Sequence, residues 1–301
     1  MLKTGFIGTL TDDLFNSISL HPGFELTGIN NRYSPGNYPV PRVSDNSILE
    51  NSQAIIIEHP GSETEDLIGR ALKRSKHLML MDLSGLYEIS LKTLLKLHSE
   101  ARTVIKIRQP ERNNPALRHC LPLVTHPSLF EIRLMTSANS NFLKGYSFKG
   151  KLLRMLDILL YLCPSNIQKV QSLRHPASIS CNGLISARLE FDNGSVANIL
   201  STGITENEVF CIDIYQNNML LRVDILKADL HILESQANGE IVNSSSRAFK
   251  HSHQASFYND LDSFYHSVNS RDTTGKDLFE ISRLLELGRN ITEKSRCSEF
   301  A

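Results

Sequence analysis

The stretch Lys3-Thr-Gly-Phe-Ile-Gly-Thr-Leu-Thr-Asp-Asp13 decides the fold that we expect for this chain. Its apolar first half predicts a strand over 2–7. Asp12 or Asp13 is then the expected cap of a helix that runs to about Leu20. A short apolar strand that turns through a glycine into a helix is typical of a βα unit, and such units pack on parallel sheets. The opening residues therefore predict an α/β protein that begins with a parallel sheet.

The same alternation of short apolar runs and amphipathic segments continues to about residue 108. Ser62, with Glu65 three residues later, resembles a capping box at the start of one of these helices. The pattern predicts strands at 24–29, 54–57, 77–81 and 103–107, and helices at 62–74 and 88–101. We therefore expect a Rossmann-like parallel-sheet domain over 1–108.

From about Gln109 the pattern changes to one that favours antiparallel strands. Ile185, Ala187, Leu189 and Phe191 alternate with polar residues, and Asp192-Asn-Gly194 follows as a hairpin turn. We expect helices at 115–120, 152–162, 256–269 and 276–294, a strand at 130–135, and a loop at 243–253. These elements predict a second α/β domain over 109–301, with a large, mostly antiparallel sheet and the two closing helices.

Charge and composition exclude several classes of function. The chain has 301 residues, and its 32 Lys and Arg balance its 32 Asp and Glu, so no overall positive field attracts nucleic acid or an anionic membrane. Its five cysteines are scattered without a Cys-x-x-Cys pair, which indicates neither a disulfide framework nor a thiolate metal site. We expect a cytoplasmic protein with no metal, no nucleic-acid partner and no membrane segment.

Several short motifs, in their order and spacing, resemble those of one enzyme family. The chain is similar to the Gfo/Idh/MocA oxidoreductases, the glucose-fructose oxidoreductase and inositol dehydrogenase family. The resemblance implies an NAD(P)-binding domain, an α/β domain whose open sheet often forms an oligomer interface, and a sugar-like substrate between them. It therefore predicts a homodimer or a higher homo-oligomer. The motifs are Lys3-Thr-Gly-Phe-Ile-Gly8, His21-Pro-Gly-Phe-Glu-Leu26, Ile55-Ile-Ile-Glu-His-Pro60, Arg112-Asn-Asn-Pro-Ala-Leu117 and Leu189-Glu-Phe-Asp-Asn-Gly194.

The cofactor positions implied by the resemblance depart from the family pattern. Of the three glycines in G-x-G-x-x-G/A, only Gly8 is present, because the second falls on Leu10 and the third on Asp13. A leucine side chain at the second position is expected to fill the volume of the pyrophosphate. We therefore expect no cofactor. Three further family positions are Asn31 and Arg32, which would favour NADP over NAD if a cofactor bound, and Pro60.

The catalytic positions implied by the resemblance have also changed. The family's lysine falls on Asp82, and the histidine and aspartate of its H-x-x-D motif fall on Arg154 and Asp157. An arginine stays protonated and cannot accept a proton as a general base. An ion pair between Arg154 and Asp157, one helical turn apart, is the structural interpretation of the second motif.

Three functions follow from these observations and stay open at this stage. The first is a degenerate oxidoreductase-like protein that keeps a ligand cleft or acts as a partner subunit. The second is an active NAD(P)-dependent dehydrogenase of a sugar or polyol that uses a relocated acid or base, such as Tyr161 or His59. The third is a purely structural, dimer-forming protein.

Overall fold

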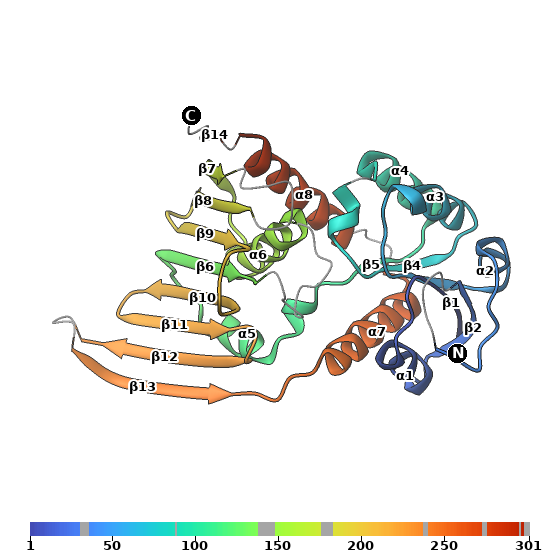
Figure 1. Cartoon of the computed structure of the whole chain (residues 1–301), viewed down its shortest axis with the longest axis horizontal. Coiled ribbons are helices and arrows are strands. Elements are labelled where there is room, and N and C mark those ends of the chain that lie inside the picture. Colours follow the sequence, from blue (N-terminus) through green and yellow to red (C-terminus); the bar gives the residue numbers. More distant parts are fainter. Residues whose placement is uncertain are drawn as a thin grey trace. The chain divides into compact units, whose positions relative to one another are not determined.

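The computed structural model describes residues 1–30, 36–87, 89–137, 148–175, 183–236, 240–272, 276–294 and 296–297. The chain forms two compact units (Figure 1). Unit 1 comprises 1–110 and 252–285, and unit 2 comprises 111–251 and 286–301. The sequence-based division at 108/109 placed both closing helices in the second domain. Residues 252–285 instead belong to unit 1, because the first closing helix completes that unit's core.

Unit 1 is built on a five-stranded parallel sheet with the strand order β2-β1-β3-β4-β5. The order reverses between β1 and β3, which makes that gap the topological switch point where open α/β sheets bind ligands. The strands are β1 (Leu2–Ile7), β2 (Phe24–Asn30), β3 (Ala54–Ile57), β4 (His77–Leu80) and β5 (Ile105–Ile107), and the helices are α1 (Asp12–Leu20), α2 (Asp45–Asn51), α3 (Glu65–Lys73), α4 (Leu91–Ala101) and α7 (His253–Ser270).

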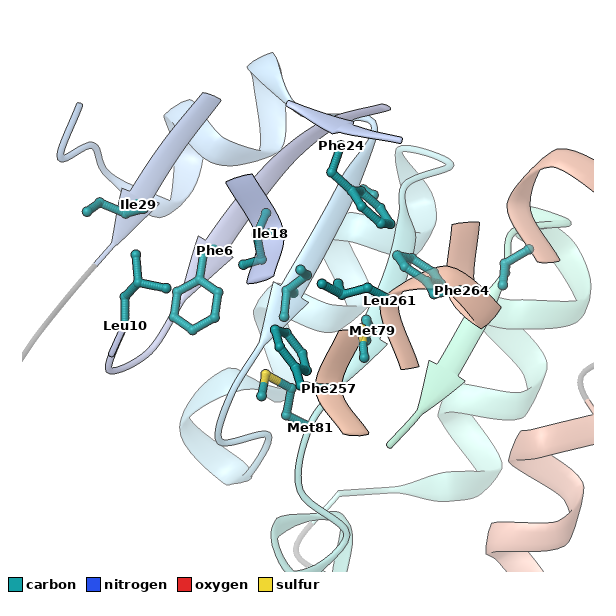
Figure 2. Packing of buried hydrophobic residues seen from close by; sticks show 13 residues of the cluster. Phe6, Leu10, Ile18, Phe24, Ile29, Met79, Met81, Phe257, Leu261 and Phe264 are labelled. Atoms are coloured by element: carbon teal, nitrogen blue, oxygen red, sulfur yellow. The ribbon is translucent and has the colours of Figure 1, made fainter. Parts of the chain in front are cut away.

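The core of unit 1 joins the sheet to two helices that lie far apart in the sequence. Figure 2 shows Phe6 and Leu10 beside Ile18 of α1, and Phe257 and Leu261 of α7 near the same sheet. All of these side chains are almost fully buried. Burial of large apolar side chains is the main source of folding free energy, so α7 is an integral part of this unit.

Unit 2 contains a nine-stranded sheet with the order β13-β12-β11-β10-β6-β9-β8-β7-β14. Neighbouring strands are antiparallel except for the pairs β6–β9 and β7–β14. The strands are β6 (Leu129–Met135), β7 (Ile167–His175), β8 (Leu184–Phe191), β9 (Val196–Thr202), β10 (Val209–Gln216), β11 (Met219–Asp224), β12 (Asp229–Ser235), β13 (Ile241–Ala248) and β14 (Arg296–Cys297). The helices are α5 (Pro115–Cys120) and α6 (Phe148–Leu162), and α8 (Lys276–Lys294) runs from unit 1 into unit 2.

The predicted alternation in β8 is confirmed by burial. Ile185, Ala187, Leu189 and Phe191 are buried, whereas Ser186 and the residues that alternate with it are more exposed. The hairpin turn after β8 places Gly194 at a φ of +84°, a conformation that favours glycine. The α/β fold class, with its parallel and mostly antiparallel sheets, is therefore confirmed.

Three local predictions were wrong. The cap of α1 is Thr11, whose Oγ1 accepts the N–H of Leu14 at 3.4 Å, so Asp12 and Asp13 lie in the first turn instead. A 3₁₀ turn over Ser62–Thr64 precedes α3, which displaces the expected capping box. The expected loop at 243–253 contains most of β13, which is a strand because it pairs with β12 over nearly all of its residues.

Within the described ranges, no helix is both long enough and apolar enough to cross a membrane.

Candidate functional site

A pocket of about 340 Å³ lies at the switch point of the parallel sheet in unit 1. Its walls come from the segments that follow three neighbouring strands, β1, β3 and β4. The carboxyl ends of parallel strands meet at one edge of a sheet, so these loops converge. The lining residues are Ile7, Gly8, Thr9, Ile57, His59, Pro60, Gly61, Ser62, Glu63, Thr64, Asp82 and Gly85.

At Gly8 the chain changes direction after β1 and enters the loop that lines the pocket. Its φ is +134°, a backbone conformation that side chains rarely adopt. A Cβ at this position would lie 2.6 Å from Cβ of Glu58 and 2.8 Å from its Oε2. The glycine is therefore required both by the turn and by the close approach of the neighbouring strand's glutamate.

Glu58 is the functional candidate that the sequence did not single out. It follows the buried strand β3, and its Oε2 accepts the backbone N–H of Thr9. His59 Nε2 lies 3.4 Å from the same oxygen. Burial raises the pKa of Glu58, an effect that His59 and the N–H of Thr9 oppose and that Asp82 reinforces. The sequence signal was a glutamate at the carboxyl end of a fully buried strand.

The side chain of Leu10 points away from the pocket, contrary to the sequence-based expectation. Only 1% of it is exposed, and it packs in the core beside Phe6 and Ile29 (Figure 2). Tyr38 covers this turn, with its hydroxyl 2.9 Å from the carbonyl oxygen of Leu10 and 3.0 Å from Oδ1 of Asp12. Leu10 therefore stabilises the turn between β1 and α1 and does not fill the volume expected for a pyrophosphate.

Two backbone donors in the loops around this pocket have partners within the chain. The N–H of Thr9 is bound by Glu58, and the N–H of Gly61 donates to Oγ1 of Thr64 at 2.8 Å. Thr11 caps the first turn of α1, which also carries Asp12 and Asp13. A helix N-terminus attracts an anion through free N–H groups and its dipole, and two carboxylates in the first turn oppose that attraction.

The charges that line the pocket are mainly acidic. Glu63 and Asp82 are lining residues, the charge of Asp82 also acts on Glu58, and no Lys or Arg is among the described residues that line the pocket. A dinucleotide needs donors or cations for its pyrophosphate. The acidic lining and the paired N–H groups of Thr9 and Gly61 do not fit that group. Among the residues placed by the structure, no cluster of three or more His, Cys, Asp and Glu side chains could hold a metal ion.

Arg154 and Asp157 lie on α6 in unit 2, where each has a partner other than the one expected. Arg154 Nη2 donates to Oε1 of Glu111, and both side chains are buried. Arg112 binds Asp157 through two hydrogen bonds, at 2.7 and 3.2 Å, and its guanidinium lies 4.9 Å from the ring centroid of Tyr161. The expected ion pair between Arg154 and Asp157 was therefore wrong, because the segment before α5 supplies opposite charges to both residues.

The sequence-predicted positions divide between the two units. Gly8, Pro60 and Asp82 come together in the walls of the pocket in unit 1, whereas Arg154 and Asp157 belong to unit 2. Asn31 and Arg32 lie outside the described residues, so the preference for NADP over NAD stays a prediction.

Comparisons with known proteins show which solved structures share this fold. No family model matches the chain, and no curated protein matches it in sequence. Among solved structures, UDP-N-acetylglucosamine 3-dehydrogenase GnnA from Acidithiobacillus ferrooxidans is similar over 98% of this chain and 97% of its own, with a TM-score of 0.75 and 15% identity.

Two other solved structures are similar over the same extent. Biliverdin reductase from Synechocystis, in complex with biliverdin and NADP⁺, has a TM-score of 0.71 and 14% identity, over 98% of this chain and 99% of its own. A mutant of a 3-ketoreductase from Actinomadura kijaniata, in complex with TDP-benzene and NADP, has a TM-score of 0.75 and 14% identity, over 98% of both chains. The chain therefore has the two-domain fold of the Gfo/Idh/MocA-type oxidoreductases, as its motifs indicated.

Proposed function

We propose that this chain is a degenerate member of the dehydrogenase fold that does not transfer hydride and that keeps a small-molecule pocket at its switch point. The observation that carries the proposal is the loss of the base position, where Arg154 is held by Glu111 in a buried ion pair. A guanidinium cannot take a proton from a substrate hydroxyl at neutral pH, and a paired, buried one is not free to reorient.

The pocket of unit 1 supports the same proposal, because its lining is unsuited to a dinucleotide cofactor. Asp82 lies in its wall, at the position that the family resemblance assigns to a lysine. A carboxylate there opposes the developing negative charge on a substrate oxygen that an ammonium would stabilise. Because the lining carries carboxylates and neither Lys nor Arg is among its described residues, we expect no useful affinity for NAD(H) or NADP(H). The ligand that we expect is a small, sugar-like molecule.

The experiment is a titration of the full chain with NAD(H) and NADP(H), followed by nicotinamide fluorescence and thermal shift. A second arm screens sugars, polyols and 2-hydroxy acids with both cofactors and measures the absorbance of the reduced nicotinamide. We expect neither binding nor turnover. A dissociation constant in the low micromolar range, or turnover that Asp82→Ala or Arg154→Ala abolishes, would overturn the proposal.

The second candidate is an active NAD(P)-dependent dehydrogenase of a sugar or polyol. It is favoured by His59, an exposed lining residue whose Nε2 lies beside the carboxylate of Glu58 and which could serve as a relocated base. The same screen separates the two candidates. Turnover that falls in His59→Gln, with Asp82→Ala unchanged, would select this second function.

We also propose that the chain forms a homodimer through the open face of the nine-stranded sheet. Tyr215 and Leu173 are exposed large side chains on strands of this sheet, and Leu200 is half-buried between buried neighbours on β9. Apolar side chains on a sheet face favour a covering layer. Light scattering should give at least twice the mass of the chain. A mass of 33.9 kDa at all concentrations would contradict it.

A further inference from the structure

The carboxylate of Glu58 lies against the backbone of the turn between β1 and α1. Its side chain is 17% exposed, and its Oε2 accepts the N–H of Thr9. The 2.8 Å between this oxygen and a hypothetical Cβ on Gly8 shows that the carboxylate occupies the space directly beside the turn. Thus the residue that follows β3 places its carboxylate against the loop that follows the neighbouring strand β1.

The position is one that would otherwise attract an anion from solution. Backbone N–H groups in the loop after the first strand, next to a helix N-terminus, form anion-binding concavities in many proteins. Here the donor of Thr9 is satisfied by a residue 49 positions away in the sequence. A phosphate group at this loop would have to displace the carboxylate or share one N–H with it.

Two titratable groups act on Glu58: His59, whose Nε2 lies 3.4 Å from its Oε2, and Asp82, which raises its pKa. Two further carboxylates lie on the segments of this region, Glu63 in the pocket lining and Asp12 in the first turn of α1. Apart from His59, these groups are acidic. Neither Lys nor Arg occurs among the described pocket-lining residues, so those residues offer no permanent cation that would offset the repulsion of a second anion.

We propose that Glu58 is an internal anion of the β1–α1 loop, which takes the backbone donor that a ligand's phosphate would need and so restricts the pocket to ligands without phosphate. The inference rests on the proposed function, because it explains why a pocket at the usual place for a dinucleotide rejects one. It goes further in naming the residue that determines the specificity. Removal of this carboxylate should convert the loop into an anion site.

The test uses sulfate and ADP as probes, because sulfate keeps a fixed charge across neutral pH. Binding to the full chain is measured by calorimetry for the wild type, Glu58→Gln and Glu58→Ala. The amide of glutamine keeps an acceptor for Thr9 without the charge, whereas alanine leaves both the donor and its space open. We expect the affinity for sulfate to rise in the order wild type, Gln, Ala, with a gain of about tenfold or more for Ala.

Glu63→Ala is the matched control, because it removes a carboxylate from the pocket lining and leaves Glu58 as the acceptor of the Thr9 N–H. Its sulfate affinity should change by no more than about twofold. An equal gain in Glu63→Ala, or no gain in either Glu58 variant, would overturn the inference. If circular dichroism shows that Glu58→Ala does not fold, the sulfate affinity of Glu58→Gln alone tests the inference.

A direct readout is the backbone amide of Thr9, followed by nuclear magnetic resonance. In the wild type its proton shift should titrate with the carboxyl group of Glu58, and in Glu58→Gln that titration should disappear. In Glu58→Ala the same resonance should move on addition of sulfate. A Thr9 amide that does not respond to sulfate would refute the inference and leave the proposed function intact. Binding of NAD(H) or NADP(H) by the wild type would instead refute the proposed function.

Discussion

The carboxylates on two elements, α6 with its neighbouring segment and the sheet edge at the pocket, have different kinds of partner. In unit 2, Glu111 and Asp157 each bind an arginine, so their charges are cancelled by permanent cations. In unit 1, the partly buried Glu58 has a backbone N–H and His59 beside it, and the charge of Asp82 also acts on it. A buried charge that has an opposite charge beside it makes the fold depend on that partner, because removal of one member leaves the other uncompensated, whereas a charge that is incompletely compensated is available for chemistry or binding.

Under our proposal, the family positions in the two units have different roles. The positions on α6 form ion pairs with Glu111 and Arg112, and the sheet edge of unit 1 has a pocket beside an internal anion. The two units should therefore respond in opposite ways when a charge is removed. Substitutions at α6 should reduce stability, and substitution of Glu58 should change ligand preference and relieve an electrostatic cost.

The largest effect is expected from Arg154→Met. It leaves the carboxylate of Glu111 buried without its cation, and the loss of one partner of a buried pair costs about 3–5 kcal/mol. Urea unfolding of the full chain measures the change. The double variant Arg154→Met with Glu111→Leu removes both charges and should recover most of the loss. A single variant as stable as the wild type would show that this pair is not the structural element we describe.

The next largest effect is expected from Leu10→Ala. The side chain is buried in the core of unit 1, so its truncation should cost about 2–5 kcal/mol in urea unfolding. It should bring no gain in affinity for ADP, because the side chain does not line the pocket. Leu20→Ala, on the exposed end of α1, is the control and should change stability by no more than about 0.5 kcal/mol. A gain in affinity for ADP would mean that Leu10 does block the pyrophosphate, as predicted from the sequence.

The sequence predicts those helices and strands whose own apolar residues are buried in a recognisable pattern. The run Ala54-Ile-Ile-Ile57 is fully buried and forms β3 at the residues expected, and the period of apolar residues fixed α8 at 276–294. β13 could not be predicted in the same way. All of its residues are exposed, and it is a strand because of its pairing with β12, which a polar sequence does not indicate.

The candidate site could be predicted only in part, for a related reason. Gly8, Pro60 and Asp82 follow three strands in order, so the topology of a parallel sheet brings them together. The direction of a side chain at a turn is not fixed by that order. Leu10 turns into the core and Glu58 turns toward Thr9, and both orientations depend on the local path of the backbone between β1 and α1.

The smallest expected effect is on the pH dependence of stability, and it tests the state of Glu58 directly. Burial raises the pKa of this carboxyl from its ordinary value of 4.5. As the pH rises above that value, the unfolded chain loses its proton before the folded chain does, so the folded state is progressively disfavoured. Below the ordinary value both states are protonated and the effect vanishes. Glu58→Gln removes this dependence while it keeps an acceptor for Thr9.

The free energy of unfolding of Glu58→Gln, minus that of the wild type, should therefore be smallest at acidic pH and increase toward neutral pH. Urea unfolding at a series of values between about pH 4 and pH 8 measures this difference. Glu50→Gln, at an exposed position of α2, is the matched surface substitution, and its difference from the wild type should stay nearly constant. A difference for Glu58→Gln that increases toward acidic pH would mean that the folded state binds the charged form more favourably than water does. In that case the carboxylate of Glu58 would be fully compensated in the folded chain, and its contrast with the arginine-paired carboxylates of unit 2 would be wrong.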